Sequence, residues 1–376
     1  MESMGRLKPA RFLYDNIFLV GSLLHAGNNV EYFSRYTRKL IVFYLLGTLK
    51  EEKDFIQVYS YGRLVETKTL FCPKLPIINY FFVYFWYVKT IVKYFDKKER
   101  FYLITFHPIF FIGNSLLKKI RKFEIVFWVA DYLPSPSFMY NIYQRLIFYY
   151  HNRNKYNLYL GDKLNMIMNG QLKNSNYQKT LMWGIKLEEQ RRRDLDQIIT
   201  LAFIGVIRKS HGLDIAFKLL QEHPSLKIKI LGECGSSLYE EYSELIGELG
   251  IKERVVFENK FYPTENLLSE LSTCFAGIAL YITDKNNPIY YTDPGKVKTF
   301  TQFGLPVIMT NTSEIVPFIK KFKAGEIADR NTDSIFRAIE KMKNNYTLYL
   351  KGVEDFNNYF NCETYYKKAF QFLETD

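Results

Sequence analysis

Cysteine, glycine and proline are scarce in this chain, and each shortage argues against a class of protein. The 376 residues include four Cys, at positions 72, 234, 274 and 362, and they form no Cys-x-x-Cys pair. This spacing argues against a zinc ribbon, a thioredoxin-type site and a disulfide scaffold, so we expect reduced, structural thiols. The 20 Gly and 12 Pro are too few for a collagen-like or low-complexity chain.

Long apolar runs are also missing. The most apolar run, Ile77–Val88, falls short of the ~20 residues that a helix needs to cross a bilayer. Residues Met1–Ala10 are polar, and no long apolar stretch follows them, so we expect no secretory signal. The expected location is cytoplasmic, either free or peripheral on the inner face of a membrane.

Positive charge is unevenly distributed. Residues 1–200 hold 30 Lys and Arg against 16 Asp and Glu, whereas residues 201–376 hold 21 against 23. Of the 65 aromatic residues, 40 also lie in the first 200. A drift of composition would raise the charge of both halves, so the excess predicts a surface that meets phospholipid headgroups or nucleic acid.

One segment combines both properties. Aromatic residues interleave with Lys89 and Lys93 over Ile77–Phe95, and the charged stretch Asp96–Arg100 follows. This pattern is typical of a basic amphipathic helix in a membrane interface, and equally of a buried helix with a solvated end.

Short apolar runs alternate with longer helical patterns along the chain, which predicts an α/β protein with parallel sheets covered by helices. In the first half, strands are expected at residues 40–46, 55–59, 102–106, 124–129 and 158–160, and helices at 30–38, 77–95, 113–122 and 137–156. In the second half, strands at 200–204, 226–231, 255–258, 277–281 and 306–310 alternate with helices at 212–221, 237–249, 264–274, 296–303, 332–345 and 364–373.

A charged stretch without an apolar stripe, residues 186–197, suits a linker or an exposed helix. We therefore expect a basic, aromatic-rich domain over residues 1–190 and a second domain over 191–345. A helical segment, 346–376, would follow and pack back on the first domain.

Two glycine-containing strand ends are candidate ligand sites in the second domain. A strand runs into Gly205, the basic pair Arg208 and Lys209 follows, and Gly212 opens a helix. Backbone amides and two cations would suit a phosphate, although a Gly after a strand is often only a turn. The second strand ends in Gly232-Glu233-Cys234-Gly235, where Glu233 would either bond a ribose or base or cap the next helix.

The strongest candidate lies between Tyr290 and Ile308. Asp293 is expected as the N-cap of a helix and Pro294 as its first residue. Lys296 then falls in the first turn, where a cation is electrostatically disfavoured unless an anion is bound. A diphosphate held by backbone amides and Lys296 would explain this arrangement, and an exposed lysine on an ordinary helix is the alternative.

These three sequence motifs, in this order, resemble the donor-binding domain of GT-B glycosyltransferases, particularly glycosyltransferase family 4. FIGVIRKSHG, LGECG and DPGKVKTFTQFGLPVIMT keep the order and spacing of the family, and Ala324-Gly325-Glu326 resembles its Gly before the last donor-domain strand. The likeness covers residues 200–330. It implies two Rossmann-like, doubly wound domains facing a central cleft.

The resemblance implies transfer of a sugar from a UDP- or GDP-sugar, which is a substrate and not a cofactor. Arg208 and Lys296 would hold the diphosphate without a metal, as catalytic residues. Tyr291 and Thr299 stand where members often carry two glutamates, so only the Thr299 hydroxyl is left for a ribose contact. The donor-binding residues implied are Gly27, Asn28, Gly205, Lys209, Gly232, Glu233, Tyr291, Asp293, Pro294, Gly295 and Thr299.

The first domain resembles the family less. Ala26-Gly27-Asn28-Asn29 corresponds to a glycine loop that faces the donor. His107 and Asp131 each follow an expected strand, so both would lie at strand carboxyl ends in the cleft. His107 would orient the sugar or acceptor, or serve only structure, and Asp131 would act in catalysis or cap the residues after it.

The resemblance further implies retention of configuration, with the transfer on one face and a donor phosphate oxygen taking the acceptor proton. The basic first half suits a glycan or lipid-linked acceptor at an anionic membrane, as in polysaccharide assembly, and no nucleic acid is expected. Two other readings stay open: a GT-B-fold epimerase or phosphorylase, and a non-catalytic basic protein that binds membrane or nucleic acid.

Overall fold

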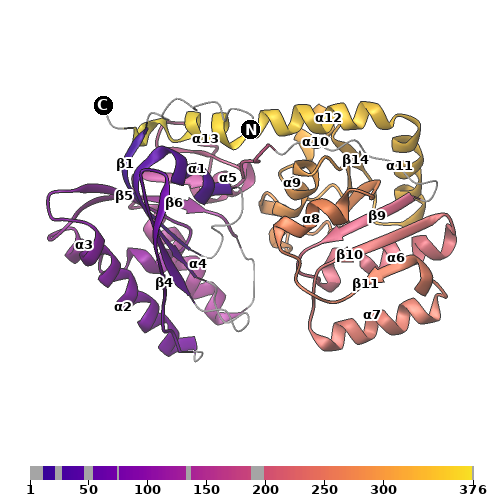
Figure 1. Cartoon of the computed structure of the whole chain (residues 1–376), viewed down its shortest axis with the longest axis horizontal. Coiled ribbons are helices and arrows are strands. Elements are labelled where there is room, and N and C mark those ends of the chain that lie inside the picture. Colours follow the sequence, from indigo (N-terminus) through magenta and orange to yellow (C-terminus); the bar gives the residue numbers. More distant parts are fainter. Residues whose placement is uncertain are drawn as a thin grey trace, which may run out of the picture. The chain divides into compact units, whose positions relative to one another are not determined.

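The computed structural model describes residues 12–21, 28–45, 54–73, 76–132, 137–187 and 199–374 (Figure 1). It divides into two compact units. Unit 1 comprises Met1–Gly184 and Cys362–Asp376, and unit 2 comprises Ile185–Asn361. Residues 188–197 of the expected linker lie outside the described residues.

Unit 1 is built on a sheet that, among its described residues, has eight strands in the order β4-β3-β2-β1-β5-β6-β7-β8. The strands are β1 (Tyr14–Gly21), β2 (Thr37–Tyr44), β3 (Phe55–Ser60), β4 (Arg63–Thr69), β5 (Arg100–Thr105), β6 (Lys122–Val129), β7 (Tyr156–Tyr159) and β8 (Gln178–Thr180). Neighbours pair in parallel except β2 with β3 and β3 with β4, which are antiparallel. The last five residues of both β1 and β2 are buried, as in the middle of a sheet that is covered on both faces.

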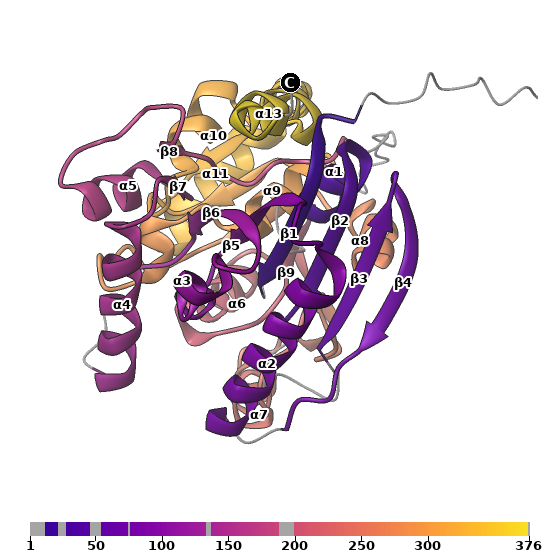
Figure 2. The same ribbon diagram turned by 90° about the vertical axis from the view of Figure 1, so that its left-hand side faces the viewer.

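Helices cover both faces of this sheet, and in Figure 2 α2, α3 and α4 lie in front of its strands. The helices of unit 1 are α1 (Asn29–Tyr36), α2 (Pro76–Tyr94), α3 (Asn114–Leu117), α4 (Phe138–His151), α5 (Asp162–Asn169) and α13 (Cys362–Ala369). The neighbours Phe127 and Trp128 of β6 point to opposite faces: Phe127 meets the ring of Phe111, and Trp128 meets that of Tyr366 in α13.

The helix expected at residues 113–122 is wrong over most of its length. It ends at Leu117, because Lys122 already begins β6 and pairs with Arg100 of β5. Among the helices that the structure describes, none is long and apolar enough to cross a bilayer.

Unit 2 is a doubly wound α/β unit. Its described strands are all parallel, in the order β11-β10-β9-β12-β13-β14. They are β9 (Ile199–Ile204), β10 (Leu226–Leu231), β11 (Val255–Phe257), β12 (Ala276–Ala279), β13 (Val307–Met309) and β14 (Gly325–Ile327). The helices are α6 (Leu213–Glu222), α7 (Ser236–Glu248), α8 (Thr264–Leu271), α9 (Gly295–Gln302), α10 (Val316–Phe322), α11 (Thr332–Asn344) and α12 (Tyr346–Tyr359).

One glycine determines how closely α9 approaches this sheet. A Cβ atom on Gly277 of β12 would lie 2.3 Å from the Phe300 ring of α9. Because no such atom is present, α9 packs directly on the strand and its first turn is held beside the carboxyl ends of β9 and β12.

Candidate functional site

The carboxyl ends of β9 and β10 touch through two glycines. Gly205 follows β9 with a left-handed φ of 82°, and its N–H donates to the Leu231 carbonyl at 3.0 Å. A Cβ atom on Gly232 would lie 2.0 Å from the Gly205 carbonyl oxygen. Both positions require glycine, one for its backbone angle and one for the close approach, so backbone lines this edge of the sheet.

A pocket of about 250 Å³ opens at this edge. Its lining residues come from the two strand ends, from the loop after β11 and from α8 and α9. They are Ile204, Gly205, Val206, Leu231, Gly232, Glu233, Phe261, Tyr262, Leu267, Lys296 and Thr299. The carboxyl edge of a doubly wound sheet is where ligands of such folds bind.

Lys296 reaches this pocket from the first turn of α9. Its Nζ atom is buried, lies 3.8 Å from the centre of the Phe203 ring, and has no hydrogen-bond or ion-pair partner within the described part of the chain. Burial and, to a smaller extent, the nearby Arg208 together lower the pKa of Lys296 to about 7. The alternative reading, an exposed lysine on an ordinary helix, is therefore wrong.

Lys298, two residues further on, has a different environment. Its Nζ lies 2.6 Å from Asp293 Oδ2, and both side chains are buried. Burial lowers the pKa of Lys298 to about 8, and the Asp293 carboxylate opposes that shift. Asp293 is not the N-cap that the sequence predicts, because Pro294 takes that position without a side-chain cap bond. Its carboxylate neutralises the buried Lys298 instead.

Two further polar groups near Lys296 are buried without a partner among the described residues: Nδ1 of His211 and the hydroxyl of Tyr281. The two rings lie edge to face with centres 5.6 Å apart, and Lys296 Nζ lies 5.7 Å from the Tyr281 ring. Burial, reinforced by Lys296 and Arg208, lowers the pKa of His211 to about 3, so its imidazole is neutral. Unsatisfied buried groups are costly, and a bound anion would satisfy the ammonium group.

The other predicted residues of unit 2 lie around this edge. Arg208 is exposed after β9, and Lys209 forms an exposed ion pair with Glu241 of α7 at 2.6 Å. Gly295 is the first residue of α9, and the Thr299 hydroxyl donates to its carbonyl at 3.1 Å. Tyr291 lies outside the pocket lining, with its ring against Tyr290 at 5.0 Å.

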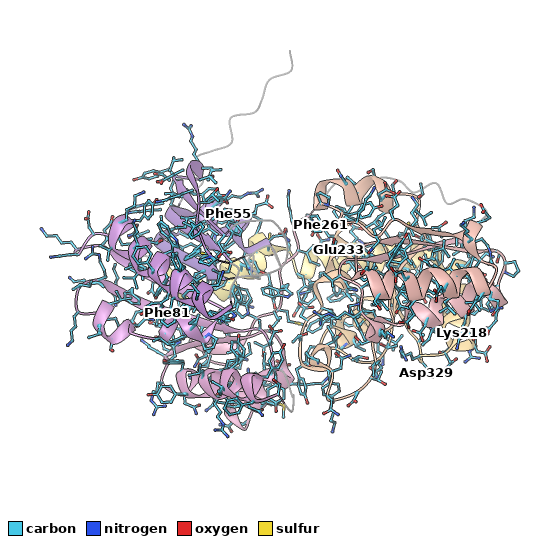
Figure 3. The ribbon with its side chains drawn as sticks, turned by 90° about the horizontal axis from the view of Figure 1, so that it is seen from below. Phe55, Phe81, Lys218, Glu233, Phe261 and Asp329 are labelled. Carbon is cyan, nitrogen blue, oxygen red and sulfur yellow. The ribbon has the colours of Figure 1, made fainter. Side chains whose placement is uncertain are left out.

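Glu233 lines the pocket and does not cap α7, whose N-cap is Gly235 without a side-chain bond. Opposite the glycines stand two aromatic residues that sequence reasoning missed, Phe261 and Tyr262. The Phe261 side chain is 64% exposed, and Figure 3 shows it near Glu233. The Tyr262 hydroxyl donates to Glu258 at 2.9 Å. The available signal was their place directly after β11, at the same edge as the other strand ends.

In unit 1, His107 follows β5 and Asp131 follows β6, as expected. The His107 ring lies edge to face with Tyr143 of α4 at 5.2 Å, and its Nδ1 atom has no hydrogen-bond partner among the residues described. Burial lowers the pKa of His107 to about 4. Burial, and then the charge of Asp131, raise the pKa of Tyr143 above its usual value. The strand ends therefore bring together a neutral imidazole, a phenol and a carboxylate.

The glycine loop of unit 1 is described in part. Gly27 lies outside the described residues, whereas Asn28 has a left-handed φ of 57° and its amide donates to the Gly184 carbonyl at 3.3 Å. The amide of Asn28 thus anchors the start of α1 within unit 1, and its role toward a donor stays a prediction.

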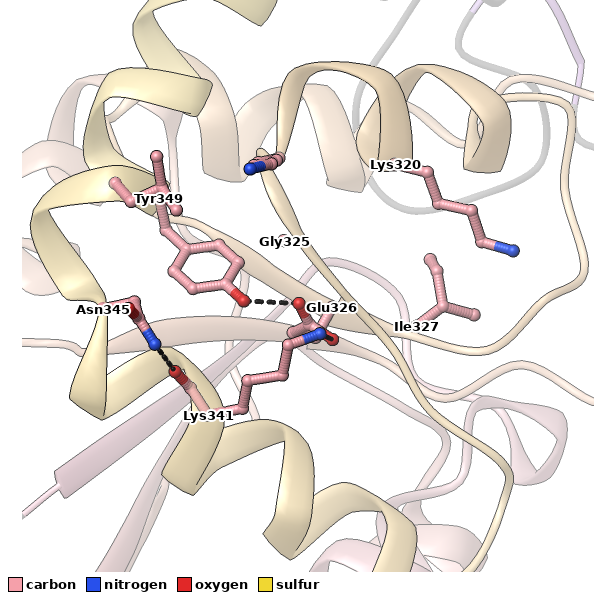
Figure 4. A pocket seen from close by; sticks show the side chains of 9 residues that line it. Lys320, Gly325, Glu326, Ile327, Lys341, Asn345 and Tyr349 are labelled. Atoms are coloured by element: carbon pink, nitrogen blue, oxygen red, sulfur yellow. Dashed lines mark hydrogen bonds and ion pairs between the residues drawn. The ribbon is translucent and has the colours of Figure 1, made fainter.

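A second pocket of unit 2, of about 570 Å³, lies beside β14 (Figure 4). Its carboxylate, Glu326, accepts from Lys341 at 2.9 Å and from the Tyr349 hydroxyl. Gly325 is a packing residue here, since a Cβ atom would lie 2.1 Å from the Val307 carbonyl oxygen. Among the described residues, Lys296 has a buried ammonium group without a hydrogen-bond partner, whereas no lysine of the second pocket does. The strand-end pocket is therefore the stronger candidate site.

Two α/β units, the first built on a mostly parallel sheet and the second on a parallel one, define the GT-B fold. The sequence matches no protein-family model and no curated protein sequence. Solved structures do match the fold, and these neighbours are GT-B glycosyltransferases. The expected fold class is thereby confirmed.

Three of these structures cover nearly the whole chain. Sucrose-phosphate synthase from Thermosynechococcus elongatus has a TM-score of 0.68 at 12% identity, covering 95% of this chain and 98% of that one. Anabaena HepE in complex with UDP-glucose has a TM-score of 0.66 at 13% identity, covering 95% and 99%. An E. coli trehalose-6-phosphate structure bound with UDP-2-fluoro glucose has a TM-score of 0.64 at 10% identity, covering 96% and 99%.

Proposed function

We propose that this protein is a glycosyltransferase that moves a sugar from a nucleotide-sugar donor to a glycan or a lipid-linked acceptor. The observation that carries the proposal is Lys296, whose buried ammonium group lines the strand-end pocket without a hydrogen-bond or ion-pair partner among the described residues. A buried cation in the first turn of a helix is stabilised by an anion that also accepts from the helix amides. A diphosphate supplies such an anion.

The residues that line the pocket support one orientation of the donor. The diphosphate would lie at Lys296 and the start of α9, with exposed Arg208 as the second cation. The nucleoside would extend toward Phe261 and Tyr262, because aromatic rings stack on bases, and Glu233 would accept from a ribose hydroxyl. The UDP-sugars bound in two of the neighbouring structures support a uridine nucleotide.

The chemistry that we propose is transfer with retention of configuration. The acceptor oxygen bonds to the anomeric carbon on the face from which the phosphate oxygen leaves, and that phosphate oxygen takes the acceptor proton. Negative charge then grows on the departing diphosphate. Lys296, with its pKa near neutrality, and Arg208 would stabilise this charge, which is where electrostatic catalysis acts.

We propose that no metal is needed for this step, since the two cations already face the diphosphate. The described residues contain no group of three or more His, Cys, Asp or Glu that could hold a metal ion. Paired carboxylates are ligands that Mg²⁺ prefers, and one such pair, Asp194 and Asp196, lies outside the described residues. Activity measured with a chelator and with added Mg²⁺ tests this part of the proposal.

For the acceptor, we propose the strand ends of unit 1. His107 is held neutral by burial, so it would orient an acceptor hydroxyl through a hydrogen bond and would not act as a cation. Asp131 is exposed beside Tyr143 and would contact polar groups of the acceptor.

Calorimetric titration of UDP and GDP, followed by a transfer screen with UDP- and GDP-sugars, tests the proposed function. Lys296→Ala removes the cation, so we expect nucleotide affinity to fall by roughly tenfold or more and turnover by ~10²-fold. The matched control is Lys320→Ala, an exposed lysine of the second pocket, which should bind and react as the parent does. Equal nucleotide affinity in Lys296→Ala and the parent would contradict the proposal.

A further inference from the structure

Helix α2 is apolar on the face that points away from the sheet as well as on the face that packs. Val83, Tyr87 and Ile91 are buried in the core of unit 1. On the opposite side Phe81, labelled in Figure 3, is 71% exposed. Phe85 is 55% exposed. An ordinary surface helix carries polar residues on its outer face. The apolar outer face of α2 is therefore suited to contact with another apolar surface.

The exposed aromatic surface extends beyond one turn of α2. Ile78 and Phe82 are also exposed, and Phe71, just before the helix, meets Phe82 edge to face at 5.9 Å. We call Phe71, Ile78, Phe81, Phe82 and Phe85 the α2 face. Four of these large apolar side chains lie on one face of the helix, and Phe71 adjoins them through Phe82, so together they form a patch of the kind that marks an interaction site.

A second exposed set begins α4. Phe138 is 75% exposed and Tyr140 is also exposed. The starts of α2 and α4 reach the same side of unit 1 in Figures 1 and 2. Both exposed sets therefore lie on this side of unit 1.

The charge around these aromatic residues is mainly positive, and the acidic Glu66 of β4 pairs with Lys93 near the end of α2. Neither α2 nor α4 contains Asp or Glu, and residues 76–122 hold nine Lys and Arg against two Asp and Glu. Lys89 lies over the Trp86 ring at 4.8 Å and over the Phe85 ring at 5.6 Å. The ammonium group of Lys68, in β4, also lies over the Trp86 ring, 4.9 Å from its centre. These ammonium groups stand beside the aromatic residues, so the patch combines apolar area with positive charge.

We propose that the α2 face docks on a bilayer that contains anionic lipid. Its aromatic rings would enter the headgroup region, and Lys89 and Lys68 would pair with lipid phosphates. A helix that is apolar and basic, but unable to span, binds in the plane of the interface. A second copy of the chain fits less well, because self-association would bring the same lysines against one another.

This docking does not depend on the donor chemistry. It would bring the proposed acceptor site toward the membrane, because Tyr143, whose ring contacts His107, belongs to α4, and α4 starts on the same side of unit 1 as α2. A lipid-linked acceptor would then reach the strand ends of unit 1 from the bilayer; this last inference rests on the proposed function.

Co-sedimentation with phosphatidylcholine vesicles, with and without phosphatidylglycerol, tests the docking. We expect binding to the anionic vesicles and a loss of about tenfold or more in Phe81→Ser/Phe85→Ser. Lys89→Glu should weaken binding to anionic vesicles and leave the weak binding to neutral ones unchanged. The matched control is Leu172→Ser, an apolar residue of unit 1 that is 51% exposed outside the α2 face.

The double serine variant should keep the parent's melting temperature and UDP affinity, which separates this test from the proposed function. Equal vesicle binding by parent and double variant, or no binding by the parent, would overturn the proposal. Sedimentation equilibrium tests the alternative that a second copy of the chain covers the α2 face. If the parent forms a dimer, the double variant is a monomer and neither binds vesicles, the α2 face would be a site of self-association instead.

Discussion

Asp293 and Lys298 form a buried ion pair, 2.6 Å between Oδ2 and Nζ, that ties the residue before α9 to the middle of that helix. The Lys298 ammonium also lies 3.7 Å from the centre of the Phe360 ring. The pair holds the start of α9 in place, and it leaves the neighbouring Lys296 as the cation that can take a ligand.

Removing one partner of this pair is expected to destabilise unit 2. Lys298→Met leaves the Asp293 carboxylate buried without its ammonium partner, which costs about 3–5 kcal/mol of unfolding free energy. Asp293→Asn/Lys298→Met removes both charges and should recover part of that loss. Urea denaturation measures both variants against Lys320→Ala. A single variant as stable as the parent would show that the pair does not hold α9.

Lys296 predicts a pH dependence of donor binding. With its pKa lowered to about 7 by burial, it is charged at pH 6 and mostly neutral at pH 8 in the unliganded protein. Anion binding favours the charged form, so affinity for UDP-glucose should fall by roughly tenfold from pH 6 to pH 8, with proton uptake on binding at pH 8. His211 does not titrate here, since its pKa is lowered to about 3.

Titration calorimetry in buffers of different ionisation enthalpy measures this proton uptake. Lys296→Arg keeps the charge at every pH, so its affinity should be flat between pH 6 and pH 8 and its proton uptake absent. An affinity of the parent protein that does not change over this range would rule out Lys296 as the anion ligand.

The two glycines of Gly232-Glu233-Cys234-Gly235 should respond differently to alanine. In Gly232→Ala the new Cβ atom would meet the Gly205 carbonyl oxygen at 2.0 Å, so the strand ends must separate and nucleotide binding should be lost. In Gly235→Ala nothing lies within 4 Å of the new atom, so affinity and melting temperature should stay near those of the parent. Normal UDP affinity in Gly232→Ala would show that the contact is not needed.

Phe261 and Lys296 should affect different parts of the nucleotide. Phe261→Ala removes a stacking surface worth ~1–3 kcal/mol, so UDP affinity should fall by roughly 5- to 100-fold while affinity for inorganic pyrophosphate stays unchanged. Lys296→Ala should weaken both ligands. Calorimetry with the two ligands gives the comparison, and a pyrophosphate affinity that falls in Phe261→Ala would place the phosphates at the wrong end of the pocket.

The alternation of strands and helices in unit 2 could be predicted from the sequence, whereas strand β1, in the middle of the sheet of unit 1, could not. In unit 2 the strand at Leu226–Leu231 has the expected bounds, because its apolar run is framed by turn residues. In unit 1, β1 was missed, although it pairs with both β2 and β5. Its apolar run, Ile17–Val20, is short and follows Asp15 and Asn16, so only pairing with its neighbours makes it a strand.

The candidate site shows the same limit. Lys296 could be predicted because the helix field disfavours a lone cation there, a local argument. The prediction of Asp293 as an N-cap was also a local argument, and it was wrong. The side chain of Lys298 is buried one turn later, and a buried ammonium group is costly without a counter-charge, so the Asp293 carboxylate pairs with Lys298 and does not cap the helix. Phe261 and Tyr262 carry no motif, so only the assembled sheet edge shows that they line the pocket.

The chain passes from unit 1 to unit 2 after Gly184 and returns at Cys362, and this order has a consequence for biosynthesis. The Tyr366 ring centre lies 5.9 Å from that of Trp128, and the Gly184 N–H donates to the Tyr366 hydroxyl oxygen at 2.6 Å. All of unit 2 is therefore synthesised before α13. Until α13 emerges, however, Trp128 and its aromatic neighbours remain uncovered, so a nascent chain halted near residue 361 would be the species that chaperones and proteases recognise.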